Sequence, residues 1–102
     1  MDGAMGGWSI YIIRCGDGSL YTGVTTELDR RLREHQGTGT AGAKYLRGRG
    51  PLQLVYSLAA ADRAEAQRIE RRVKKLPRKQ KEMLIAGQFA LPIAAIRAED
   101  EP

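Results

Sequence analysis

The sequence predicts an α+β domain in which a small three-stranded antiparallel sheet is flanked by helices, in the order β-β-α-β-α-α. Two short segments rich in β-branched and aromatic residues surround a glycine-rich turn, and a third alternating segment follows later. Between and after these segments, apolar residues recur at helical spacing. With 102 residues, we expect one core and no separate recognition domain.

Residues 9–13 and 20–24 are predicted to form a β-hairpin around the turn Cys15-Gly16-Asp17-Gly18-Ser19. If the loop consists of residues 16–18, Tyr11 and Tyr21 lie on the same face of the sheet at diagonal positions. A two-residue loop would place them on opposite faces. Taken alone, both tyrosines are better explained as packing residues, because tyrosine is common in strands.

A helix is expected after the hairpin, with Thr26 as its N-cap and Asp29 three residues on in a near capping box. It should run to about His35 and end at Gly37. Arg31 and His35 are four residues apart and therefore share a face, where a cation beside an imidazole could grip a phosphate and move a proton. An ordinary ion pair of Arg31 with Glu27 is the alternative.

The glycine-rich segment 37–51 matches no Walker or dinucleotide-binding motif. Its flexible backbone and cations suit contact with a nucleic-acid backbone, with Tyr45 as a possible stacking ring; a solvated loop is the alternative. The cations are Lys44, Arg47 and Arg49. Residues 52–58 alternate after Pro51 and are predicted to be the third strand.

The longest helix is expected to open at Asp62, with Ala66, Ile69, Val73 and Leu76 as its buried stripe, and to close at Pro77. A second helix should cover residues 78–86 and stop at Gly87. The apolar run 89–96 is expected to cover an edge of the core. We therefore predict a lead-in over residues 1–7, one domain over 8–96 and an acidic tail over 97–102.

Basic charge is concentrated between residues 63 and 81. This segment holds nine basic and two acidic residues, about +7, whereas the formal net charge of the chain is +5. Such asymmetry favours a nucleic-acid partner over a merely solvated helix face. The candidate contacts on this helix are Arg71, Lys74 and Lys75.

Glu70 follows Ile69 and so lies about 100° around the helix, at the border of the buried stripe. A carboxylate at that border could hold a hard divalent cation, with water filling the remaining positions. On local spacing alone, the alternative of an ion pair with Lys74, four residues on, is favoured.

A single cysteine excludes an internal disulfide and a cysteine-rich zinc site, and a reducing cytoplasm is the expected compartment. No apolar run reaches the roughly 18 residues of a membrane span, and residues 1–7 lack the features of a signal peptide. We expect no membrane partner.

Over about residues 8–86 the chain resembles the GIY-YIG nuclease family, particularly its bacterial single-domain branch and the catalytic domain of structure-specific endonucleases. Ser9-Ile10-Tyr11 and Tyr21-Thr22-Gly23 correspond to the two signature halves. An arginine ten residues after the second tyrosine, a histidine one turn later and a glutamate in a later helix complete the resemblance; these are Arg31, His35 and Glu70. Ser9 and Thr22 depart from the signature, and no matching asparagine follows Pro77.

The resemblance implies a metal-dependent endonuclease that hydrolyses phosphodiester bonds in DNA, with branched or damaged DNA in repair or recombination as the implied substrate. It assigns Mg²⁺ or Mn²⁺ to Glu70 and a phosphate clamp to Arg31, and implies no small-molecule cofactor. Tyr11 is the first candidate for the general base, while Tyr21 and His35 position phosphate and water; the three could exchange roles. A non-catalytic nucleic-acid binding module is the alternative, and a subunit whose basic face meets an acidic protein is a third.

Overall fold

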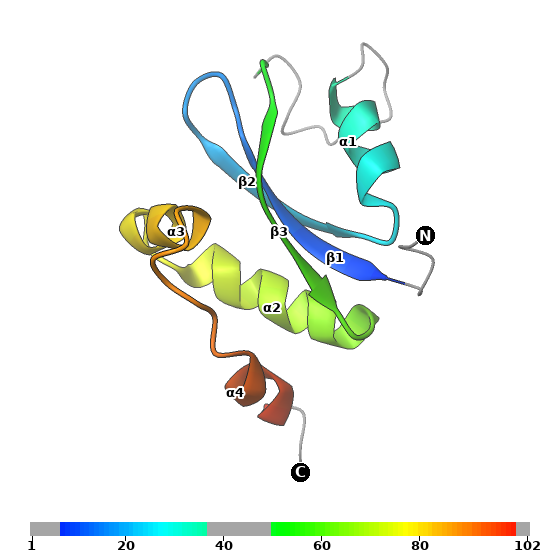
Figure 1. The fold of residues 1–102 in the computed structure, drawn as a ribbon, viewed down its shortest axis with the longest axis vertical. Helices are drawn as coiled ribbons and strands as arrows, with labels where there is room; N and C mark the ends of the chain where they lie inside the picture. The colour runs from blue at the N-terminus through cyan, green and yellow to red at the C-terminus, as the bar shows by residue number, and fades with distance from the viewer. Residues whose placement is uncertain (1–6, 37–49, 100–102) are drawn as a thin grey trace.

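The structure is a computed structural model that describes residues 7–36 and 50–99, except the side chains of residues 35 and 36. In the described part, the expected succession of strands and helices is confirmed, and a short fourth helix follows it (Figure 1). The elements are β1 (Trp8–Arg14), β2 (Leu20–Thr25), α1 (Leu28–Gln36), β3 (Gln53–Ala60), α2 (Arg63–Lys75), α3 (Arg78–Ile85) and α4 (Ile93–Ala98).

The three strands form one antiparallel sheet in the order β2-β1-β3. In the hairpin, Ile13 pairs with Tyr21 and Tyr11 pairs with Gly23. The Cys15 amide donates to the Ser19 carbonyl at 2.9 Å, and Gly18 takes the left-handed conformation with φ +88°, which glycine adopts without steric cost. The loop is therefore residues 16–18, the three-residue alternative.

Each face of the sheet carries its own apolar cluster, because neighbouring residues of β1 point in opposite directions. Ile10 and Ile12 face α2 and belong to the larger cluster, whereas Tyr11 and Ile13 belong to a smaller cluster under α1. Figure 1 shows α1 on one side of the sheet and α2 along the other. The two tyrosines thus belong to the α1 face.

Helix α1 begins at Leu28, so the expected cap at Thr26 is wrong. The Thr25 hydroxyl accepts a hydrogen bond from the Glu27 amide at 3.1 Å, and the Glu27 carbonyl accepts the first helical bond, from the Arg31 amide. A threonine turn at the end of β2 therefore precedes the helix. The expected stop at Gly37 lies outside the described residues.

Helix α2 begins as expected, because the Asp62 carboxylate accepts a hydrogen bond from the Glu65 amide at 2.8 Å. Ala66, Ile69 and Val73 are fully buried against the sheet. From the run 89–96, the larger cluster takes Leu91 and Ile96, the second of which lies in α4.

A network of charged side chains ties α3 to the hairpin. Arg14 donates two hydrogen bonds to the Glu82 carboxylate, at 2.8 and 2.7 Å. Arg78 donates to the same carboxylate at 3.0 Å and to the Gly18 carbonyl at 2.7 Å. Glu82 therefore joins the end of β1 to α3, and Arg78 joins α3 to the turn.

Across residues 7–36 and 50–99, no helix combines the length and apolarity needed to cross a bilayer.

Candidate active site

Tyr11 and Tyr21 lie together on the α1 face of the sheet. Their ring centroids are 6.2 Å apart and the rings are tilted by 45°, a separation typical of interacting aromatic pairs. Tyr11 is 2% exposed, whereas Tyr21 is half-buried. The register of the hairpin, with one tyrosine on each strand at diagonal positions, brings the rings into contact.

The ring of Tyr11 lies across Gly23 of the neighbouring strand. A Cβ atom built at residue 23 would be 2.6 Å from the Tyr11 hydroxyl and 3.1 Å from Cε2 of Tyr21. Only a residue without a side chain leaves room for this arrangement. Gly23 thus allows the Tyr11 hydroxyl to reach β2, an edge strand of the sheet.

Arg31 joins the tyrosines from α1. Leu28 and Leu32 pack this helix against the smaller cluster, and Arg31 comes from the same side, where its guanidinium donates a hydrogen bond to the Tyr11 hydroxyl. It also donates to the Glu34 carboxylate at 3.1 Å, and its side chain is 37% exposed. Arg31 can therefore meet a ligand from solvent while it holds Tyr11.

The environment of Tyr11 favours its neutral hydroxyl. Burial and the neighbouring Tyr21 raise the pKa of Tyr11 to about 12, although Arg31 acts in the opposite direction. Burial disfavours the charged form of any side chain. At neutral pH the Tyr11 hydroxyl is therefore neutral in the free protein and can donate a hydrogen bond.

Glu70 comes from α2, the helix on the other face of the sheet. Its carboxylate forms an ion pair with Lys74 at 3.1 Å, and its side chain is 21% exposed. This is the pairing that local spacing favoured over a metal ligand. The described residues contain no cluster of three or more His, Cys, Asp and Glu side chains that could hold a metal ion.

The single carboxylate of Glu70 still fits a magnesium-type site, because Mg²⁺ is commonly held by one or two carboxylates, water and substrate phosphates. It does not fit zinc, which takes three or four protein ligands. The ion pair with Lys74 is partly exposed, and such pairs contribute little. Glu70 is therefore available to a hard cation that arrives with substrate.

An open pocket of about 310 Å³ lies between the start of β2 and the helices α2 and α3. Its lining residues are Leu20, Tyr21, Thr22, Lys74 and Lys81. Tyr21 belongs both to the tyrosine pair and to this pocket, and Lys74 is the partner of Glu70. The pocket therefore lies at β2 on the side of the helix that carries the glutamate, and Tyr21 is the residue that it shares with the tyrosine pair.

The remaining predicted site residues differ in position. His35 lies in α1, but its side chain is outside the described residues, as are Lys44, Arg47 and Arg49. The cations predicted on α2 are exposed, namely Arg71, Lys74 and Lys75. The sequence analysis did not single out Lys81, because its place in the pocket beside β2 depends on how α3 folds back. The basic run in which it lies was the available signal.

Comparison with known proteins identifies the family. Residues 7–83 match the sequence pattern described as the GIY-YIG catalytic domain. The chain is 52% identical over 83 residues to a UPF0213 protein of Cronobacter sakazakii, covering 81% of this chain and 85% of that protein. It is 51% identical over 79 residues to the UPF0213 protein YhbQ of Escherichia coli, covering 78% and 77%.

The fold is also shared with solved structures. The solution NMR structure of the UPF0213 protein BH0048 from Bacillus halodurans has a TM-score of 0.52 and 41% identity, and the match covers 93% of this chain and 97% of that chain. The NMR structure of EF2693 from E. faecalis has a TM-score of 0.55 and 39% identity, over 79% and 84%.

A small antiparallel sheet with paired tyrosines and an arginine on one face is the arrangement of a nuclease catalytic domain, and this chain belongs to the GIY-YIG family. The resemblance drawn from the sequence is confirmed, including its bacterial single-domain branch. Membership indicates a nuclease with a nucleic-acid substrate.

Proposed function

We propose that this protein is a divalent-metal-dependent endonuclease that hydrolyses phosphodiester bonds in DNA. Branched or damaged DNA in repair or recombination is the proposed substrate, and the cytoplasm the proposed location. The observation that carries the proposal is the contact of Tyr11, Tyr21 and Arg31 on one face. A buried hydroxyl held by a partly exposed guanidinium is a site prepared for an anionic, oxygen-rich group.

Phosphodiester hydrolysis needs in-line attack by water, neutralisation of the phosphoryl oxygens and support for the leaving oxygen. Arg31 clamps a non-bridging oxygen with its planar guanidinium. Tyr11, protonated at neutral pH, donates to the phosphate rather than accepting a proton from water. Orientation and deprotonation of the water then fall to Tyr21 and His35.

Glu70 is the proposed ligand of Mg²⁺ or Mn²⁺, which when bound supplies charge neutralisation at the phosphate and support for the leaving oxygen. The carboxylate must exchange its partner Lys74 for the cation. Because Lys74 also lines the pocket beside Tyr21, its ammonium is then free to meet a phosphate of the substrate.

The test compares wild type with Glu70→Ala and Arg31→Ala on labelled flap, fork and duplex DNA, each with and without Mg²⁺ or Mn²⁺. Both variants should lose at least 100-fold in cleavage rate while keeping the circular dichroism spectrum of the native fold. Arg30→Ala is the matched control, because Arg30 is the adjacent arginine of α1 and is 61% exposed. Retained cleavage by Glu70→Ala refutes the metal assignment.

A non-catalytic nucleic-acid binding module is the second candidate. It is favoured by the exposed cations of α2, which would bind a phosphate backbone without any need for the tyrosines. Salt-sensitive binding by wild type, with no cleavage of any of the three DNA forms under either metal, would establish this function instead.

A further inference from the structure

Lys81 is one of the two charged residues that line the pocket beside Tyr21. It lies in the middle of α3, is half-buried and lines the pocket together with Lys74. Within the described part of the chain, Lys81 takes part in no ion pair. Both charged side chains of the lining are thus cations, and only one of them has an anionic partner.

The position of Lys81 is fixed by its neighbours. Glu82, the next residue, accepts hydrogen bonds from Arg14 and from Arg78. Arg78 also holds the Gly18 carbonyl at 2.7 Å. These contacts hold α3 against both the end of β1 and the hairpin turn. The position of Lys81 on α3 is therefore fixed relative to that of Tyr21 on β2.

We propose that this pocket is a subsite for a second phosphodiester of the nucleic-acid strand that is cleaved, with Lys81 as its principal cation. The inference rests on the proposed function and extends it from the scissile phosphate to its neighbour. The pocket shares Tyr21 with the tyrosine pair. A strand that places one phosphate at Tyr11 and Arg31 therefore passes the pocket with an adjacent one.

The chemistry of the lining favours a phosphate over other anions of the cell. Two ammonium groups and the Thr22 hydroxyl present donors to several oxygens of one tetrahedral group. Leu20 offers apolar contact for a sugar beside it. The pocket is open to solvent on one side, as a site must be if a continuous strand is to pass through it.

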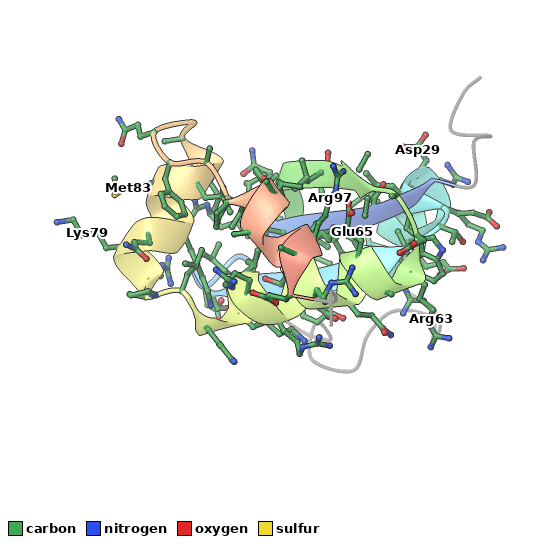
Figure 2. All side chains as sticks on the ribbon, turned by 90° about the horizontal axis from the view of Figure 1, so that it is seen from below. Asp29, Arg63, Glu65, Lys79, Met83 and Arg97 are labelled. Carbon is green, nitrogen blue, oxygen red and sulfur yellow. The ribbon has the colours of Figure 1, made fainter. Side chains whose placement is uncertain are left out.

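The test measures binding of a labelled single-stranded oligonucleotide by fluorescence anisotropy in EDTA. Lys81→Gln is compared with Lys79→Gln, the same charge change on the same helix. Lys79 is exposed and points away from the body of the molecule (Figure 2). Lys81→Gln should weaken binding about five- to tenfold and reduce the slope of log Kd against log salt by about 0.7, the value for one phosphate contact on a single strand.

A series of oligonucleotides, each with one uncharged methylphosphonate linkage, then locates the contact. At one linkage, neutralisation should weaken oligonucleotide binding by wild type and by Lys79→Gln. It should leave binding by Lys81→Gln unchanged, since the partner of that phosphate is already absent. Lys81→Arg should restore affinity. Equal weakening by Lys81→Gln and Lys79→Gln, with no linkage coupled to Lys81, overturns the subsite.

Cleavage by wild type in Mg²⁺, measured in parallel, separates this inference from the proposed function. Cleavage without coupling to Lys81 refutes the subsite and leaves the nuclease in place. Coupling without cleavage supports the subsite and refutes the nuclease. Absence of any binding to DNA or RNA refutes both.

Discussion

Gly23 shows how a single missing side chain can define a site. Its role here is space, since the ring of Tyr11 occupies the volume in which a Cβ atom would lie. Glycine is the usual solution where one group must approach a backbone closely. Gly23, in the second signature half, therefore leaves the space that the ring of Tyr11, in the first half, occupies.

Gly23→Ala should abolish most activity without unfolding the protein. A methyl group 2.6 Å from the Tyr11 hydroxyl forces the ring to move, and a displacement of about 1 Å in an active site can cost about 100-fold in rate. Cleavage assays with circular dichroism check this. Gly18→Ala is the control, because its Cβ would meet nothing within 4 Å and its φ of +88° affects stability instead.

Tyr11→Phe should lower the cleavage rate about 10- to 100-fold without shifting the pH-rate profile between about pH 6 and 9. The pKa of Tyr11 is raised from 10.0 to about 12, so the hydroxyl stays protonated throughout that range. The stabilising contribution of the neutral hydroxyl is complete below pH 10 and is lost as the pH rises towards about 12.

Absorbance of tyrosinate at high pH provides an independent measurement. Tyr11→Phe should remove ionisation near pH 12, whereas Tyr56→Phe, at another tyrosine whose pKa is raised by burial, should leave the Tyr11 ionisation in place. A pH-rate profile that changes shape in Tyr11→Phe would instead return the role of general base to this residue.

The sequence predicted those contacts that follow from local backbone geometry. The three-residue loop fixed Tyr11 and Tyr21 to one face, because strand periodicity leaves no other choice. It did not predict that burial would raise the pKa of Tyr11, since this depends on α1 covering the ring. It also misplaced the start of α1, because the Thr25 hydroxyl forms a turn with the Glu27 amide and the helix begins only at Leu28.

At the scale of elements, Glu82 connects α3 to the hairpin. Hydrogen bonds from Arg14 and Arg78 lower the pKa of its carboxyl from 4.5 to about 2. The stabilisation is therefore complete above about pH 4.5 and is lost as the pH falls towards about 2.

Glu82→Gln should unfold more readily than wild type at pH 7, and the difference should shrink as the pH falls from about 4.5 towards 2. Urea unfolding at several pH values measures it. Glu27→Gln is the control, because its pair with Arg30 is 3.5 Å long and both side chains are more than half exposed. A pH-independent difference would mean that Glu82 contributes through packing alone.

Helix α4 is held to α2 by Glu65, one of the two acidic residues in the basic segment 63–81. The Glu65 side chain is 5% exposed and pairs with Arg97 at 2.6 Å, and it also accepts from the Ala61 amide at 3.1 Å. Figure 2 shows Glu65 and Arg97 side by side. The helix was not predicted because six residues after Pro92 give too short a period to recognise.

Glu65→Ala should lower the free energy of unfolding by about 1–3 kcal/mol, because it leaves the Ala61 amide and the Arg97 guanidinium without their acceptor. Glu65→Gln should lose less, since an amide oxygen can still accept a hydrogen bond. Thermal unfolding compares both with Arg63→Ala, an exposed neighbour on the same helix. Equal stability of Glu65→Ala and wild type would show that α4 needs no such tie.

At the scale of the whole molecule, the sequence predicted one sheet, the helix order and a basic surface. It did not predict on which face of the sheet the candidate catalytic residues and the basic residues lie. The tyrosines and Arg31 lie on the α1 face, while Glu70 and the basic residues of α2 belong to the helix on the opposite face. The pocket at β2 combines residues of that strand with Lys74 of α2 and Lys81 of α3, and this combination depends on how the helices pack.

Among residues 7–36 and 50–99, the two apolar clusters differ in size, with nine buried residues on the α2 face and three on the α1 face. Regions with little buried apolar area open with a lower free energy than the whole domain. Native-state hydrogen exchange should therefore show α1 amides exchanging through a partial opening that leaves β1 and α2 protected. The face that carries the tyrosines can then open and close around a nucleic-acid strand while the other half of the domain stays folded. Identical opening free energies for α1 and α2 would exclude this independence.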